Sequence, residues 1–138
     1  MPVDWNDLEE GSMLPELKKQ PGITDLVIFS AGNGDFNPLH HDVNSPHAKA
    51  LGSVLVHGRY KFAVLGQLVS DWMGHSGKIK TISCRYTGMD MPDKPILCKG
   101  LVRQKREEDG ARFADLDIWT EDEAGTPTTQ GKAVVRFD

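Results

Sequence analysis

The chain has 138 residues, a length that suits one domain with a core large enough to fold without disulfides or metals. Charged residues make up 26% of it and the formal net charge is −4, which argues against a broad nucleic-acid-binding surface. No apolar run reaches the length of a membrane span, and the N-terminus lacks the basic-then-apolar pattern of a signal peptide. We therefore expect a cytoplasmic protein with no nucleic-acid or membrane partner.

The N-terminal part predicts two short elements. An edge strand is expected near residues 14–19, and a short helix over 25–31. Thr24 suits the N-cap of that helix, and Asp25 would lie at its positive end. The glycine-rich sequence of residues 32–34 would then end it.

The next part alternates an irregular segment with a helix. Residues 34–56 lack regular periodicity, and a loop of that length inside a small domain generally has a function. Residues 58–73 are helical in pattern and apolar on most sides, which predicts a buried helix ending at Gly74.

The remainder, 77–138, predicts four strands. Leu116 and Ile118 alternate with more polar neighbours, as in a half-buried strand. Asp109-Gly110 is a strong hairpin signal, and 125–127 predicts another turn. Together the elements indicate an α+β fold, a curved antiparallel sheet with a helix on one face.

The two cysteines, Cys84 and Cys98, lie in predicted strands and could be close on neighbouring ones. Two cysteines do not make a disulfide framework, so we expect free thiols.

The sequence Gly34-Asp35-Phe36-Asn37-Pro38-Leu39-His40 is the most informative part of the irregular segment. Pro38 excludes an ordinary helix here, since it forces the preceding residue out of the helical region. Asp35 and His40 can divide the proton transfers that adding or removing water requires. An isolated Asp-x-Asn-Pro sequence is often only a turn, because its side chains bond their own backbone.

The pattern continues with His57-Gly58 at the head of the predicted helix. Together these residues resemble the signature of the MaoC-like dehydratases, or R-specific enoyl-CoA hydratases (hydratase 2). The resemblance implies a single hot-dog domain over 1–138, a curved antiparallel sheet wrapped around a central buried helix. It also implies a hydro-lyase that adds water to a trans-2-enoyl thioester to give the R-3-hydroxyacyl thioester.

The resemblance assigns roles to individual residues. Asp35 and His40 would be catalytic, acting on one water molecule. The Gly58 amide would be the oxyanion hole, since negative charge builds on the thioester oxygen and a helix start offers a donor to it. Asn37 and His57 would support the site, with a structural role for Asn37 an equal alternative.

The helix that follows Gly58 is expected to line the acyl pocket, with Phe62 and Gly66 as pocket residues. Gly66 would open room for a bulky acyl group or only allow close packing on the sheet. The sequence departs from the family at Arg59, where an apolar residue is usual. Arg59 would reshape the pocket or contact a neighbouring subunit.

Coenzyme A enters only as part of the substrate, and no other cofactor is expected. Lys80 and Arg85, in a basic cluster with other lysines, are weak candidates for its phosphates, and a solvated strand edge explains them as well. His40, His41, His47 and Asp42 lack the regular spacing of a zinc site, and the family pattern uses no metal.

The expected partner is an acyl-CoA, with an acyl carrier protein as the alternative carrier. Domains of this family pair into homodimers, and a heteromer is possible. Two other functions remain open: a hot-dog acyl-CoA thioesterase, and a non-catalytic partner subunit of a heteromeric MaoC-like hydratase.

Overall fold

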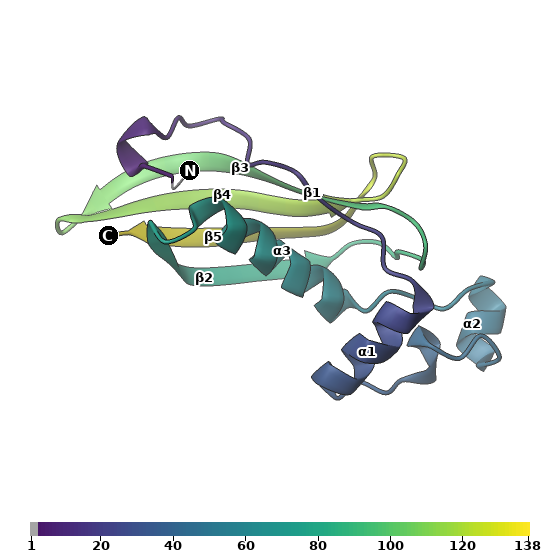
Figure 1. The fold of residues 1–138 in the computed structure, drawn as a ribbon. Coiled ribbons are helices and arrows are strands. Elements are labelled where there is room, and N and C mark those ends of the chain that lie inside the picture. Colours follow the sequence, from purple (N-terminus) through teal and green to yellow (C-terminus); the bar gives the residue numbers. More distant parts are fainter. Residues whose placement is uncertain (1–2) are drawn as a thin grey trace.

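A computed structural model describes residues 3–138 and shows a five-stranded antiparallel sheet in the order β1-β3-β4-β5-β2 (Figure 1). The strands are β1 (Leu17–Lys19), β2 (Gly77–Tyr86), β3 (Ile96–Glu108), β4 (Ala111–Glu121) and β5 (Pro127–Phe137). The helices are α1 (Ile23–Asn33), α2 (Pro46–Leu51) and α3 (Gly58–Met73), with 3₁₀ turns η1 (Trp5–Asp7) and η2 (Pro38–His40). These elements confirm the α+β prediction.

The long strands follow the expected alternation. On β4, Leu116 and Ile118 are buried, while Asp117 between them is half-buried. Strands β3 and β4 are joined at Asp109-Gly110, and both residues have positive φ, 51° and 76°. That conformation fits a two-residue hairpin turn, so the hairpin prediction is confirmed.

Helix α3 begins at Gly58 and ends at Met73, as the sequence predicts. Its sheet-facing side is buried and belongs to the main core, through Val64, Leu65, Leu68 and Val69. The prediction that α3 is apolar and covered on most sides is wrong in one respect. Arg59, Ala63 and Gln67 are exposed, and their spacing of four residues places them along one uncovered face.

The start of α1 also differs from the prediction. The helix begins at Ile23 with Gly22 as its N-cap, and the Gly22 N–H donates to Asp25 Oδ2 at 2.8 Å. Thr24 therefore lies inside the first turn instead of capping it. Asp25 remains at the positive end, where a carboxylate is favoured.

Two further expectations are corrected. The segment 34–56 is not irregular throughout, because it contains η2 and α2. Cys84 on β2 and Cys98 on β3 are not on neighbouring strands, since β4 and β5 lie between them in the sheet. Both cysteines are free.

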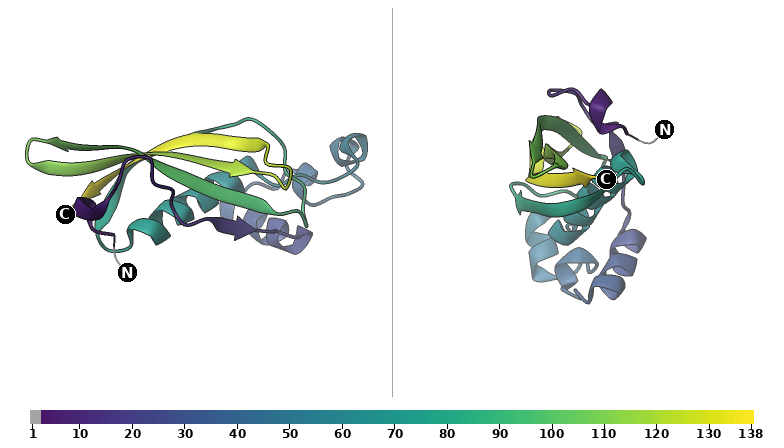
Figure 2. Two further views of the ribbon diagram at one scale, coloured as in Figure 1. Left: turned by 90° about the horizontal axis from the view of Figure 1, so that it is seen from above. Right: turned by 90° about the vertical axis from the view of Figure 1, so that its left-hand side faces the viewer.

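The arrangement divides the molecule into two regions. Figures 1 and 2 show α1, η2 and α2 gathered beyond one end of the sheet, beside the N-terminal end of α3. The 3₁₀ turn η1 and the C-terminus lie toward the opposite end. None of the helices within residues 3–138 combines the length and apolar character that crossing a bilayer requires.

Candidate active site

Asp35 follows directly on the C-terminus of α1. Gly34 ends the helix in the left-handed conformation, with φ 71°, and its N–H donates to the Ser30 carbonyl. The Asp35 N–H donates to the same carbonyl at 3.1 Å. The backbone of the catalytic candidate is therefore tied to the last turn of a helix. Its side chain accepts from the Asn37 N–H at 3.3 Å.

His40 ends the 3₁₀ turn η2. Asn37 caps this turn, its Oδ1 accepting from the Leu39 N–H at 3.0 Å. His40 Nδ1 lies 2.7 Å from the Leu55 carbonyl oxygen. Since a carbonyl only accepts, Nδ1 carries the hydrogen, and Nε2 of the neutral ring has a free lone pair. The visible role of Asn37 is to brace the loop.

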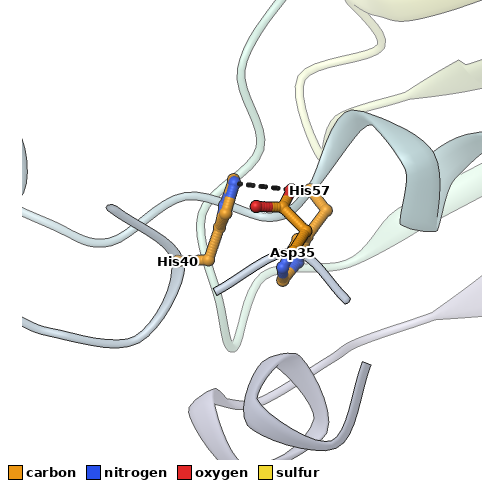
Figure 3. Close-up of side chains that lie close together, drawn as sticks. All are labelled: Asp35, His40 and His57. Atoms are coloured by element: carbon orange, nitrogen blue, oxygen red, sulfur yellow. Dashed lines mark ion pairs between the residues drawn. The ribbon is translucent and has the colours of Figure 1, made fainter. Parts of the chain in front are cut away.

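The carboxylate and the imidazole face each other. His40 Nε2 lies 3.7 Å from Asp35 Oδ2, and Figure 3 shows the two side chains pointing toward one another. This separation is longer than a direct hydrogen bond and places both groups within reach of one small molecule. The His40 side chain is 12% exposed and that of Asp35 36%, so the pair lies at the edge of the fold and is accessible from outside.

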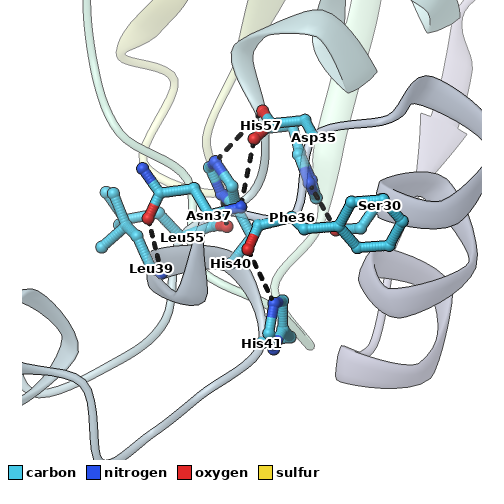
Figure 4. A network of polar contacts seen from close by, with 9 residues as sticks. All are labelled: Ser30, Asp35, Phe36, Asn37, Leu39, His40, His41, Leu55 and His57. Atoms are coloured by element: carbon cyan, nitrogen blue, oxygen red, sulfur yellow. Dashed lines mark hydrogen bonds and ion pairs between the residues drawn. The ribbon is translucent and has the colours of Figure 1, made fainter.

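His57 forms the wall behind this pair. Its ring stacks on His40 with centroids 3.7 Å apart and planes 20° from parallel. His57 Nε2 lies 2.9 Å from Ser30 Oγ, a contact drawn in Figure 4. Burial, together with the neighbouring His40, lowers the pKa of His57 from its ordinary value, so this ring is held neutral near pH 7.

Ser30 was missed by the sequence analysis and connects these parts. Its hydroxyl contacts His57, and its carbonyl accepts from the backbone of Gly34 and Asp35. The side chain is fully buried. A serine near the end of a predicted helix carries no distinctive signal, because its partners lie 27 residues away and in the following loop.

Gly58 is the first residue of α3 and follows His57 directly. Its N–H has no acceptor within the helix, and the positive end of the helix dipole lies there. A Cβ at this position would lie 2.9 Å from the Tyr86 ring. A side chain at this position would therefore require the exposed Tyr86 ring to move.

A groove of about 700 Å³ runs between α1 and α3 beside Tyr86. It is mostly apolar, and its lining includes Ile28, Phe29, Arg59, Phe62, Ala63 and Tyr86. Phe62 thus lines a hollow, as a pocket residue would. Arg59 is exposed on the same groove.

Gly66 lies one turn beyond the groove lining. A Cβ built at Gly66 meets no atom within 4 Å. The alternative in which Gly66 serves only to pack α3 closely on the sheet is therefore wrong. The space beside it is open.

The predicted basic cluster does not gather around the Asp35–His40 pair. Lys80 and Arg85 are exposed on β2, and Arg85 lines a separate groove of about 840 Å³ that also contains Trp119 and Lys132. Three further lysines of the same strands and loops are paired with carboxylates: Lys78 with Asp138, Lys94 with Glu123, and Lys99 with Glu121.

Asp35, His40 and His57 offer ligand atoms within 4.8 Å of one another, a spacing that invites comparison with a metal site. Imidazole lone pairs lie in the ring plane, and the two stacked rings are only 20° from parallel. Their lone pairs therefore do not converge on a single point, as the ligands of one metal ion must. The geometry suits proton transfer better than chelation.

Comparison with known proteins identifies the family to which this chain is similar. Residues 13–115 match the MaoC-like domain family. The beta subunit of the 3-oxo-4,17-pregnadiene-20-carboxyl-CoA hydratase of Mycobacterium tuberculosis is 32% identical over 75 residues, 54% of this chain and 58% of that protein. The match thus spans less than two thirds of that relative.

Solved structures extend the likeness to nearly the whole chain. The (R)-hydratase from A. caviae involved in PHA biosynthesis aligns with a TM-score of 0.82 and 23% identity, over 96% of this chain and 98% of that one. The ChsH1–ChsH2 complex from M. tuberculosis aligns with a TM-score of 0.79 and 24% identity, over 94% and 98%. These similarities confirm the hot-dog fold.

Proposed function

We propose that this chain, which belongs to the MaoC-like domain family, reversibly adds water to a trans-2-enoyl thioester and forms the R-3-hydroxyacyl thioester. The observation that carries the proposal is the facing pair at the end of α1 and η2. His40 Nε2 and Asp35 Oδ2 lie 3.7 Å apart, with the His40 tautomer set by the Leu55 carbonyl.

The pair can handle both protons of the reaction. One water molecule held between Nε2 and the carboxylate loses a proton to the pair as its oxygen bonds to the β-carbon of the substrate. The electrons of the double bond shift toward the thioester carbonyl. The same pair then delivers a proton to the α-carbon, so the elements of one water are added on one face.

Negative charge develops on the thioester oxygen during this step. The Gly58 N–H is a suitable donor, because it opens α3 and has no helical acceptor. Its neighbour His57 stacks on His40, so donor and proton-transfer pair are adjacent. A neutral His57 next to them avoids a competing positive charge at that position.

The acyl group would extend along the groove between α1 and α3, past Phe62 toward the open space at Gly66. Coenzyme A is the proposed carrier, with an acyl carrier protein as the alternative. The M. tuberculosis relative is named for a coenzyme A thioester of a large polycyclic acid. A groove of this size supports acyl groups larger than crotonyl. No cofactor beyond the substrate's own coenzyme A is proposed.

A partner subunit is also proposed, either a second copy or a related chain. Strand β2, ten residues long, is at the edge of the sheet and pairs with β5 on one side only. Open edges of this length are normally covered. Structural neighbours include complexes of two different chains, ChsH1–ChsH2 and HadBC. A related chain is therefore proposed as an alternative to a second copy.

The experiment is a hydration assay with crotonyl-CoA and enoyl-CoAs of increasing size, on the pure protein. Loss of enoyl absorbance with the thioester intact is the expected result. Release of free thiol would instead identify a thioesterase. Inactivity of the pure protein, restored by a related chain, would identify a subunit of a heteromer.

The stereochemistry is tested separately. Addition on one face by one pair should give the R product, so an S-specific 3-hydroxyacyl-CoA dehydrogenase should give little signal when coupled to the reaction. A strong signal in that coupled assay would contradict the assignment.

A further inference from the structure

Lys61 and Asp90 form an ion pair inside the fold, close to the start of α3. Lys61 Nζ lies 3.0 Å from Asp90 Oδ2, and both side chains are 3% exposed. Charged side chains are rarely buried this fully, because removal from water costs several kcal/mol per ion. An apolar pair would generally stabilise the fold as well, so the burial calls for another explanation.

The ammonium group of Lys61 contacts three segments of the chain. It is ion-paired with the Asp90 carboxylate, and it donates hydrogen bonds to the Gly88 carbonyl at 2.8 Å and the Thr128 carbonyl at 3.2 Å. Lys61 thus links three segments: the first turns of α3, the loop after β2, and the start of β5. All three meet at Lys61, three residues after Gly58.

Asp90 holds the chain on both sides of Gly58. Its backbone carbonyl accepts from the Val56 N–H at 2.9 Å, two residues before Gly58. Its carboxylate pairs with Lys61, three residues after Gly58. One residue therefore fixes both ends of the short stretch that carries the proposed oxyanion donor.

Tyr86 closes the remaining side of this stretch. Its ring atoms lie 2.9 Å from the position that a Cβ of residue 58 would take. The loop that follows Tyr86 carries Gly88 and Asp90, both in contact with Lys61. The Lys61 contacts thus hold the loop that begins directly after Tyr86.

We propose that Lys61 and Asp90 are a positioning pair that fixes the direction of the Gly58 N–H toward the reacting thioester oxygen. This inference rests on the proposed hydratase function. A donor to developing charge acts through its preorganised direction, so a small rotation of the stretch around Gly58 reduces its effect. The pair touches no reacting atom and acts through the backbone.

The test uses two variants. Asp90→Asn keeps the size of the side chain and the backbone carbonyl but removes the charge. The double variant Lys61→Met with Asp90→Leu removes both buried charges. The matched control is Asp115→Asn. Asp115 pairs with Arg106 at 3.0 Å on β3 and β4 and belongs to no part of the proposed site.

For folded protein, kcat should fall about tenfold or more in both Asp90 variants, with a much smaller change in KM, since removing an oxyanion donor outright typically costs about 10²–10³-fold. Amide exchange at Val56, whose N–H donates to the Asp90 carbonyl, should become faster in the same variants. The Asp115→Asn control should keep wild-type kcat and wild-type exchange at this amide.

A double variant that folds with wild-type kcat and wild-type exchange would overturn the inference, because the pair would then be a replaceable part of the core. Should Asp90→Asn fail to fold, the double variant decides. Hydration by the wild type, lost in Asp35→Asn, shows separately that the proposed function holds. A wild type that hydrates no enoyl thioester would overturn that function and the catalytic role of the pair with it.

Discussion

Asp35 and His40 owe their positions to backbone contacts more than to each other. The Asp35 N–H is bound by the Ser30 carbonyl, and His40 Nδ1 is held at 2.7 Å from the Leu55 carbonyl. The two side chains are therefore oriented before any substrate arrives. This kind of preorganisation allows a carboxylate and an imidazole to share one water molecule.

Replacing either member of the pair should remove hydration without unfolding the protein. We expect Asp35→Asn and His40→Ala each to reduce turnover by about 10²–10⁴-fold, the usual contribution of a proton-transfer group. Steady-state kinetics on enoyl-CoA measure the loss, and thermal melts check the fold. Either variant retaining more than about a tenth of wild-type turnover would contradict the assignment.

His57 should make the stability of the fold depend on pH. Its pKa is lowered in the folded state, so the unfolded chain binds more protons as the pH falls through the ordinary value of 6.5. Stability contributed by neutral His57 is therefore present above that pH and is lost below it, at up to about 1.4 kcal/mol per pH unit.

Denaturant unfolding at pH 7.5 and at pH 5.5 measures this effect. His57→Gln, which cannot gain the proton, should show a smaller difference between the two conditions than the wild type does. An identical pH dependence of both proteins would show that His57 is not held neutral. His75, which is exposed, provides the control substitution His75→Gln.

At the scale of elements, α3 serves two purposes on adjoining faces. Val64, Leu65, Leu68 and Val69 pack on the sheet and carry its stability. The other face, with Phe62 beside the groove and Gly66 one turn further, is left open. A change on that second face should therefore alter substrate choice while leaving the core intact.

Gly66 tests this division. Gly66→Ala should keep or raise the melting temperature, because alanine favours a helix interior by roughly 0.5–1 kcal/mol over glycine. Gly66→Leu should fold normally, retain activity on crotonyl-CoA, and lose activity on large acyl groups. Kinetics across a series of acyl sizes, with melts alongside, measure both effects. Equal loss of activity on small and large substrates would show that Gly66 does not border the acyl channel.

At the scale of the molecule, the two edges of the sheet differ. One edge is the three-residue strand β1, while the other is β2, ten residues long and paired only with β5. Long unpaired edges promote association. The proposed site lies beyond one end of the sheet, where α1 exposes Val27 and Ile28 to 48% and 65%.

We therefore expect the chain to associate in solution through β2. Light scattering should give at least twice the 15.3 kDa of one chain, either for the pure protein or after co-expression with a related MaoC-like chain. Hydrogen exchange should show protected amides along the outer edge of β2. A monomer in both preparations, with rapid exchange along β2, would contradict the expectation.

Local features of the fold were predictable because their causes are local. The bounds of α3 follow from its apolar pattern and from Gly74, and the β3–β4 hairpin follows from Asp109-Gly110, a sequence that readily takes positive φ. The motif from Gly34 to His40 predicted the candidate site for the same reason, since turn geometry and proton-transfer groups lie within one short stretch.

Contacts between distant parts of the chain were decided only by the tertiary structure. The pairing of Lys61 with Asp90 was not predictable, because a lysine in a predicted helix is ordinarily solvated. The same holds for Ser30 beside His57, and for the strand order that separates the two cysteines. Sequence patterns report what a residue and its near neighbours prefer, whereas the partner of a buried charge or hydroxyl depends on how the whole sheet folds over α3.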